Sequence, residues 1–201
     1  MSMTKCVALF FILASVASAF QSIHHVTIHR QPSSLKAGTS VEAFLAEKYP
    51  AFLSIVSRNA AVMKLLREST GKGCTIFAPN SKAFEDLGDK KRMQLADDRN
   101  YESVEKIGAY HVVAEEAVTA EKLFASGGVV TLGGIVDVGR SVSGGFFGVG
   151  GKEDGGVTIN GAKVIETFEL GDTCIVHEVD CFISPQLLWR YVDQLRIPFS
   201  S

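Results

Sequence analysis

The sequence has few of the features that mark a disulfide-built, metal-binding or nucleic-acid-binding protein. Its 201 residues include four cysteines, and none of them forms a Cys-x-x-Cys pair, which excludes a zinc site of the usual spacing. Basic residues number 20 against 22 acidic ones, so we expect no nucleic-acid partner, which would need a clustered basic surface. No Asn-x-Ser/Thr sequon occurs, so N-glycosylation is not expected.

A short apolar run stands at the N-terminus. Lys5 precedes a run that begins at Val7, and Ala17, Ser18 and Ala19 form a small-x-small pattern. The run falls short of the roughly 20 residues that a membrane-spanning helix needs. We therefore predict that residues 1–19 are a signal peptide cleaved after Ala19, with a buried N-terminal helix as the alternative.

Residues 20–40 contain no aspartate or glutamate but are rich in serine, histidine and basic residues. This composition resembles a transit peptide, and a disordered linker is the alternative. Phe20 directly after the predicted cleavage site resembles the junction of plastid precursors in algae with complex plastids. We expect such a plastid as the destination, reached through the secretory pathway, with secretion as an extracellular protein as the alternative.

The first half of the remaining chain has helical patterning. Apolar residues recur at helical spacing from Val41 to Leu66, interrupted by Pro50, which predicts two short helices. Residues 74–78 are β-rich and predict a strand. Side chains suited to cap short helices follow at Asn80, at residues 97–100 and at Thr119.

The second half has β-type patterning. Twelve of the 19 glycines lie between residues 127 and 156, and residues 145–155 predict a loop longer than a hairpin requires. Asn160 and Gly161 stand between alternating apolar residues, which predicts a tight hairpin turn. A last strand is predicted over residues 174–183. Helices followed by a β-rich half predict an α+β fold with a mainly antiparallel sheet.

Four motifs in this order resemble those of the fasciclin (FAS1) domain family. The residues that carry the resemblance are Thr75, Phe77, Ala78, Pro79 and Phe84 in a first signature box, Tyr110 and His111 in a Tyr-His motif, Asn160 and Gly161 in a hairpin, and His177, Asp180 and Pro185 in a second box. The resemblance implies the FAS1 β-wedge, flanked by short helices, over residues 41–186, with the two boxes on neighbouring strands. Glu178 departs from the family pattern, which has an aliphatic residue there.

The family mediates adhesion and has no general catalytic machinery. The resemblance therefore implies a non-enzymatic module without a cofactor that binds a protein or a polysaccharide. A carrier of a small ligand or lipid in an apolar crevice between helices and sheet is the alternative. Residues 187–201 predict an amphipathic helix with an apolar stripe through Leu187, Leu188, Tyr191, Val192 and Leu195. We expect it to pack on the domain, with weak contact to a membrane surface as the alternative.

Two sets of reactive side chains need a separate interpretation. His111, His177 and Asp180 resemble an incomplete metal shell, but residues three apart on a strand point to opposite faces. We therefore predict hydrogen-bonded structural roles for them and no metal site. Cys74 and Cys174 would each begin a strand of one box, so a disulfide is conceivable if the strands are neighbours, while free thiols are favoured.

Overall fold

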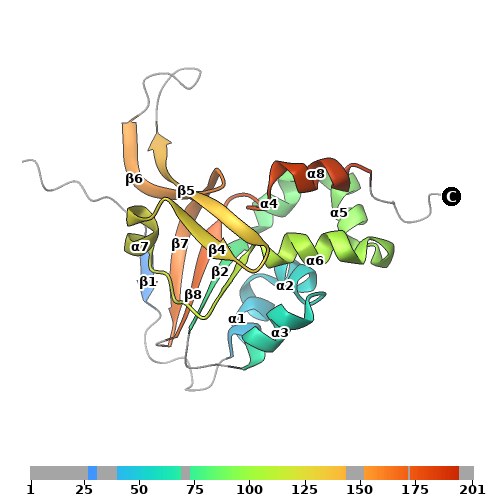
Figure 1. Ribbon diagram of the computed structural model, residues 1–201, viewed down its shortest axis with the longest axis horizontal. Coiled ribbons are helices and arrows are strands. Elements are labelled where there is room, and N and C mark those ends of the chain that lie inside the picture. Colours follow the sequence, from blue (N-terminus) through green and yellow to red (C-terminus); the bar gives the residue numbers. More distant parts are fainter. Residues whose placement is uncertain (1–26, 31–39, 69–72, 144–151, 172, 195–201) are drawn as a thin grey trace, which may run out of the picture.

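The computed structural model describes residues 27–30, 40–68, 73–143, 152–171 and 173–194 (Figure 1). The strands are β1 (Thr27–Arg30), β2 (Cys74–Pro79), β3 (Val112–Ala114), β4 (Gly128–Thr131), β5 (Gly134–Ser143), β6 (Lys152–Ile159), β7 (Ala162–Leu170) and β8 (Cys174–Val179). The helices are α1 (Val41–Lys48), α2 (Pro50–Val56), α3 (Ala60–Arg67), α4 (Ser81–Asp86), α5 (Gly88–Ala96), the 3-10 turn η1 (Asp98–Asn100), α6 (Tyr101–Ala109), α7 (Ala120–Ala125) and α8 (Gln186–Val192).

The strands form one sheet in the order β3-β2-β8-β7-β6-β5-β4, with β1 beside β7. The β2–β8 and β1–β7 pairs are parallel and the others are antiparallel. Two backbone hydrogen bonds, from Leu132 N to Val112 O at 2.8 Å and from Gly133 N to Ala109 O at 3.0 Å, join the turn after β4 to the start of β3 and to the end of α6, which precedes it. The sheet therefore curls until its two edges approach, which gives the predicted wedge with the two boxes side by side.

Alternation along β2 divides the core between the two faces of the sheet. Ile76 and Ala78 belong to the apolar cluster that contains residues of α1–α3, whereas Phe77 belongs to the cluster shared with β4–β7 and α7. A third cluster joins α2, α5, α6 and α8. In Figure 1, α1–α3 lie at one end of the sheet, and α4, α5, α6 and α8 lie together beside it. β2 is buried along its whole length because both of its faces are covered.

Three predictions about the helices and strands were wrong. Residues 41–67 form three helices instead of two, because Pro50 occupies the first turn of α2 and the Asn59 side chain caps α3. The helix α5 was not predicted. β8 ends at Val179 and not at Ile183, because after Asp180 the chain leaves the sheet, and Ile183 N donates to a side-chain nitrogen of His111.

The helix α8 also differs from the predicted stripe. Leu188, Trp189 and Val192 pack in the third cluster, while Leu187 and Tyr191 are exposed. Leu195 lies outside the described residues. Packing on the domain is therefore confirmed, but the buried face is rotated from the predicted one. Among the described residues, no helix has the length and apolar character needed to cross a bilayer.

Part of the segment expected to lie outside the domain pairs with the sheet. β1 falls within residues 20–40 and runs parallel to β7, with Thr27 opposite Glu166 and Arg30 opposite Glu169. β7 therefore has β1 as a neighbour in addition to β6 and β8.

The predicted loop at residues 145–155 overlaps β6, so that prediction was wrong at its C-terminal end. Asp154 accepts hydrogen bonds from Lys163 Nζ at 2.6 Å, Gly156 N at 3.0 Å and Ser141 Oγ at 3.1 Å. These bonds tie the start of β6 to β5 and β7. Residues 144–151, including Phe146 and Phe147, lie outside the described residues.

Replacement of residues 144–151 by a two-residue Asn-Gly turn is expected to lower the free energy of unfolding by less than about 1 kcal/mol, because loop-closure entropy changes slowly with length. Deletion of residues 145–155 is expected to cost more, because it also removes Asp154 with its three bonds. Urea denaturation of both variants measures the difference. Equal losses of stability would contradict the assignment of Asp154 to the folded sheet.

Candidate binding surface

The residues of the first signature box are buried and serve the fold. Thr75, Phe77, Ala78 and Pro79 all lie in β2 with little or no exposed surface. The Thr75 hydroxyl donates to Glu116 O at 2.8 Å and accepts from Val118 N at 2.7 Å. These two bonds fix the segment between β3 and α7 against β2, so the box is a structural element and not a surface site.

The two signature histidines, His111 and His177, have buried hydrogen-bond partners on both ring nitrogens. His177 Nδ1 lies 2.8 Å from Thr167 Oγ1, and Nε2 lies 2.8 Å from Val118 O. Because a carbonyl only accepts, the proton of neutral His177 lies on Nε2, and the threonine hydroxyl donates to Nδ1. Burial lowers its pKa to about 4. The ring is therefore uncharged at neutral pH.

His111 is held in the same way with the other tautomer. Its Nε2 accepts from Ile183 N at 3.2 Å, and Nδ1 donates to Ile107 O at 2.9 Å. Burial lowers the pKa of this histidine to about 4 as well. Neither ring has a nitrogen left for a metal or a substrate. Among the described residues, no group of three His, Cys, Asp or Glu side chains is placed to hold a metal ion.

Three further signature residues, Asn160, Gly161 and Asp180, join the hairpin to the segment after β8. Asn160 and Gly161 have positive φ angles of 48° and 87°, as the predicted turn requires. The Asn160 side chain donates to Ile183 O at 2.7 Å and accepts from Asp137 N at 2.8 Å. Asp180 Oδ1 accepts from Lys163 N at 2.7 Å. The hairpin, β5 and the chain before α8 are thus joined at one end of the sheet.

The last three signature residues pack around the same region. Tyr110 is half-buried, and its ring lies so close to the β4–β5 turn that a Cβ at Gly133 would come within 2.6 Å of it. Phe84 meets Phe182 edge-on, with ring centroids 4.9 Å apart. Pro185 stands immediately before α8.

Glu178 is accommodated by a polar cluster that the sequence did not reveal. Glu178 and Glu166 are opposite each other on β8 and β7. Lys48 Nζ lies 3.1 Å from Glu166 and 3.7 Å from Glu178, and the Tyr49 hydroxyl donates to Glu178 at 2.6 Å. Burial, followed by the Glu178 carboxylate, raises the pKa of Tyr49. The ammonium group offsets the repulsion between two facing carboxylates.

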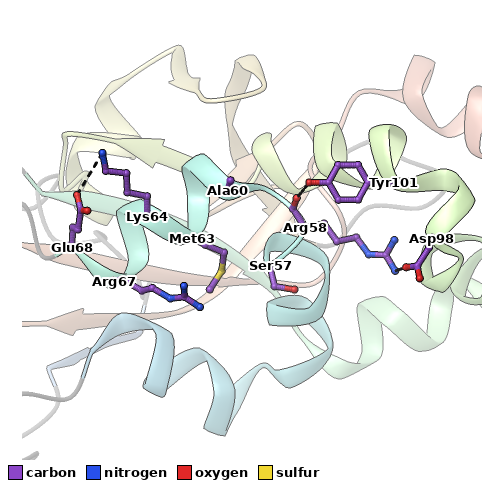
Figure 2. A pocket seen from close by; sticks show the side chains of 9 residues that line it. All are labelled: Ser57, Arg58, Ala60, Met63, Lys64, Arg67, Glu68, Asp98 and Tyr101. Carbon is purple, nitrogen blue, oxygen red and sulfur yellow. Dashed lines mark hydrogen bonds and ion pairs between the residues drawn. The ribbon is translucent and has the colours of Figure 1, made fainter.

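A groove of about 700 Å³ lies between α3 and α6, and Figure 2 shows the side chains that line it. Its lining residues are Ser57, Arg58, Ala60, Met63, Lys64, Arg67, Glu68, Asp98 and Tyr101. Arg58 extends to Asp98 at 3.1 Å, and Lys64 lies 4.0 Å from Glu68. Arg67 makes two hydrogen bonds to Glu42, at 3.0 and 3.2 Å. Each cation of this groove is paired with a carboxylate, so the groove has no excess charge to select an ionic ligand.

A second groove, of about 640 Å³, lies where the signature hairpin meets α8. Its lining residues are Ile135, Asp137, Asn160, Gly161, Ala162, Cys181, Phe182, Ser184, Pro185 and Trp189. We call it the hairpin groove. Ser184 is only 6% exposed, and its hydroxyl has no hydrogen-bond partner among the described residues. A buried polar group without a partner is costly, so this hydroxyl favours a ligand that supplies one.

The rim of the hairpin groove is apolar and continues onto the β4–β5 hairpin. Ile135 is 72% exposed, and Val130, its partner across the β4–β5 pair, is 68% exposed. The exposed carboxylate of Asp137 has no ion pair within the described part of the chain. The groove thus combines exposed aliphatic side chains with an unpaired hydroxyl and an unpaired carboxylate.

An apolar crevice of about 350 Å³ also exists, lined by Ala51, Ser54, Ile55, Arg58, Phe84, Arg92, Leu95 and Ala96. It lies among α2, α4 and α5 and not between helices and sheet, where the carrier alternative placed it. No side chain that carries the family resemblance lines it except Phe84.

The curled sheet, the parallel pair of signature strands and the two buried structural histidines define a β-wedge module. The chain matches the sequence model of the Fasciclin domain over residues 47–185, and it therefore belongs to the fasciclin domain family. The solved structure of a FAS1 domain pair from the insect cell adhesion molecule Fasciclin I is similar at a TM-score of 0.44 and 17% identity, over 67% of this chain and 44% of that chain. The chain thus spans less than half the length of that pair. No relative was found among curated protein sequences.

Proposed function

We propose that this chain is a non-enzymatic binding module that holds a protein partner in the hairpin groove. Fasciclin domains are adhesion-related modules, and the protein with the similar solved structure is a cell adhesion molecule. The single observation that supports this site is the unpartnered, buried Ser184 hydroxyl beside an exposed apolar rim. The absence of catalysis is supported by the two histidines, whose ring nitrogens are both occupied.

The chemistry of the hairpin groove favours a protein over a polysaccharide. Ile135 and Val130 offer branched aliphatic surface, which apolar side chains of a protein cover well, since burial stabilises in proportion to apolar area. Asp137 fits a basic or other donor group next to that apolar side chain. We therefore expect a segment in which an apolar residue stands beside lysine or arginine.

I135D is expected to weaken partner binding by at least about tenfold, because it places a second carboxylate on the apolar rim. V142D is the matched control, since Val142 is an exposed aliphatic residue of the same strand outside the groove. The measurement replaces each position with a photo-crosslinking residue in the full chain and compares the protein captured at 135 with that captured at 142.

Capture of one protein at 135 but not at 142, lost when Ser184 is also replaced by alanine, supports the proposal. Equal capture at both positions contradicts it. Retention by polysaccharide columns that I135D abolishes would replace the protein partner with a glycan. A lipid that stays bound in native mass spectrometry and is unaffected by I135D would favour the apolar crevice and the carrier alternative.

We further propose that the chain reaches a complex plastid through its first 40 residues. A fluorescent fusion of residues 1–40, expressed in an alga with a complex plastid, is expected to accumulate in that organelle. The same fusion with Phe20→Ala is expected to remain in the endomembrane system or to be secreted, because the aromatic residue would then be missing from the new N-terminus. Secretion of both fusions would contradict the plastid destination and favour an extracellular adhesion module.

A further inference from the structure

The two buried cysteines face each other across the two signature strands. Cys74 and Cys174 are directly opposite in the parallel β2–β8 pair, which lies side by side in Figure 1. Neighbouring strands are about 4.8 Å apart, inside the Cα separation that a disulfide requires. Both side chains belong to the same apolar cluster and are free thiols. Their backbones therefore need no large movement to bring the sulfurs together.

The register at this point is held by contacts immediately before the pair. Cys74 N donates to Thr173 O at 2.8 Å. Gly73 has a φ of 97°, and a Cβ there would lie 2.9 Å from Ala117 N and 3.0 Å from Thr173 O. Only glycine lets the two strand ends approach this closely. The geometry of the thiol pair is thus built into the strand ends.

The two thiols differ in reactivity. The nearby Cys74 side chain lowers the pKa of Cys174 to about 7, and the Thr173 hydroxyl lies 4.0 Å from the Cys174 sulfur. The Cys174 side chain, together with burial, raises the pKa of Cys74. Cys174 therefore loses its proton more readily than Cys74, which lies beside it as the second thiol, an arrangement suited to stepwise oxidation.

We propose that Cys74 and Cys174 are a redox modification site at which hydrogen peroxide forms a reversible disulfide that locks the two signature strands together. The Cys174 thiolate attacks one peroxide oxygen, the O–O bond breaks, and hydroxide leaves to become water. The Cys74 sulfur then attacks the sulfenic acid of Cys174, loses its proton, and displaces the hydroxyl group as a second water. Two electrons pass from the thiol pair to the peroxide, and an external dithiol reverses the reaction.

The test uses the full chain with C6S and C181S, which leaves only this pair of cysteines. After peroxide treatment, unfolding and alkylation, intact mass is expected to show the loss of two hydrogen atoms and no alkylated thiol. Reduction with dithiothreitol should restore two alkylatable thiols. The oxidised protein is expected to melt about 5–10 °C higher, because the bridge restrains the unfolded chain. Two alkylatable thiols after peroxide, a dimer linked between chains, or an unchanged melting temperature would overturn the proposal.

Single replacements separate the roles of the two thiols. In the same background, C74S retains a hydroxyl donor beside Cys174, so peroxide should produce a sulfenic acid that dimedone traps at Cys174. C174S removes the effect of Cys174 and leaves burial to raise the pKa of Cys74, so less dimedone adduct is expected at Cys74 than at Cys174 in C74S. Adduct formation at Cys74 in C174S, with none at Cys174 in C74S, would reverse the assigned order and contradict the proposed route.

Discussion

Phe77→Ala is expected to lower the free energy of unfolding by about 3–5 kcal/mol, the usual cost of removing a buried aromatic ring. Phe77 has no exposed surface and belongs to the cluster between β2, β8 and the β4–β7 half of the sheet. Its ring stacks on His177 with centroids 5.6 Å apart and planes 20° apart. The cavity would therefore open beside a histidine whose hydrogen bonds depend on its position. Small domains are stable by only about 5–15 kcal/mol, so the variant should be marginally folded.

Urea denaturation of the variant and of Phe124→Ala measures this effect with the same chemical change at two sites. Phe124 is partly exposed on α7 and contacts Arg140 by a cation–π interaction at 4.8 Å. Its replacement is expected to cost less than about 1 kcal/mol. Similar losses for the two variants would contradict the central position of Phe77 in the core.

Much of this core was predictable because it rests on local signals. The β-rich residues of the first box predicted β2, and the Asn160-Gly161 turn predicted the β6–β7 hairpin, with both positive φ angles in place. Asn80 and Thr119 cap α4 and α7 as their position before helical segments predicted. In each case the determining interaction lies within four residues along the chain, so the sequence alone contains it.

What the sequence did not reveal depends on contacts between distant segments. The helix α5 is rich in Lys and Arg and buries only Gln94 and Leu95, so it shows no apolar period. Ser184 does not cap α8, which begins after Pro185 without a side-chain cap, and the residue instead lines the hairpin groove. Glu178 departs from the family pattern, and only the fold shows that it pairs with Lys48 and accepts a hydrogen bond from Tyr49. The direct opposition of Cys74 and Cys174 likewise depends on a strand register fixed by hydrogen bonds.

Lowering the pH from about 7 to about 5 is expected to reduce the free energy of unfolding by about 4 kcal/mol through the two buried histidines. In the folded protein, burial lowers the pKa values of His111 and His177 to about 4 from the ordinary 6.5. Between these values the unfolded chain binds two more protons than the folded one. Stability is therefore fully present above about pH 6.5 and is lost as the pH falls toward about 4.

The pH window separates this effect from that of the carboxylates. Asp154, whose pKa is lowered to about 2 mainly by its hydrogen bond to Lys163, loses its stabilising effect only below its ordinary value of 3.8. Denaturation curves between about pH 7 and pH 5 should therefore report the histidines.

His177→Gln provides the decisive comparison, since it removes one titrating ring and retains an amide that can donate toward Val118 O. The variant is expected to be less stable at neutral pH, because glutamine cannot reproduce both bonds of the ring. Its loss of stability between about pH 7 and pH 5 should nevertheless fall to about 2 kcal/mol, because only His111 still takes up a proton on unfolding. A pH dependence equal to that of the unchanged protein would show that His177 is not held neutral in the core. Both tautomers assigned from the hydrogen bonds require the uncharged ring, so the pH dependence tests the same arrangement that excludes these histidines from binding metal or substrate.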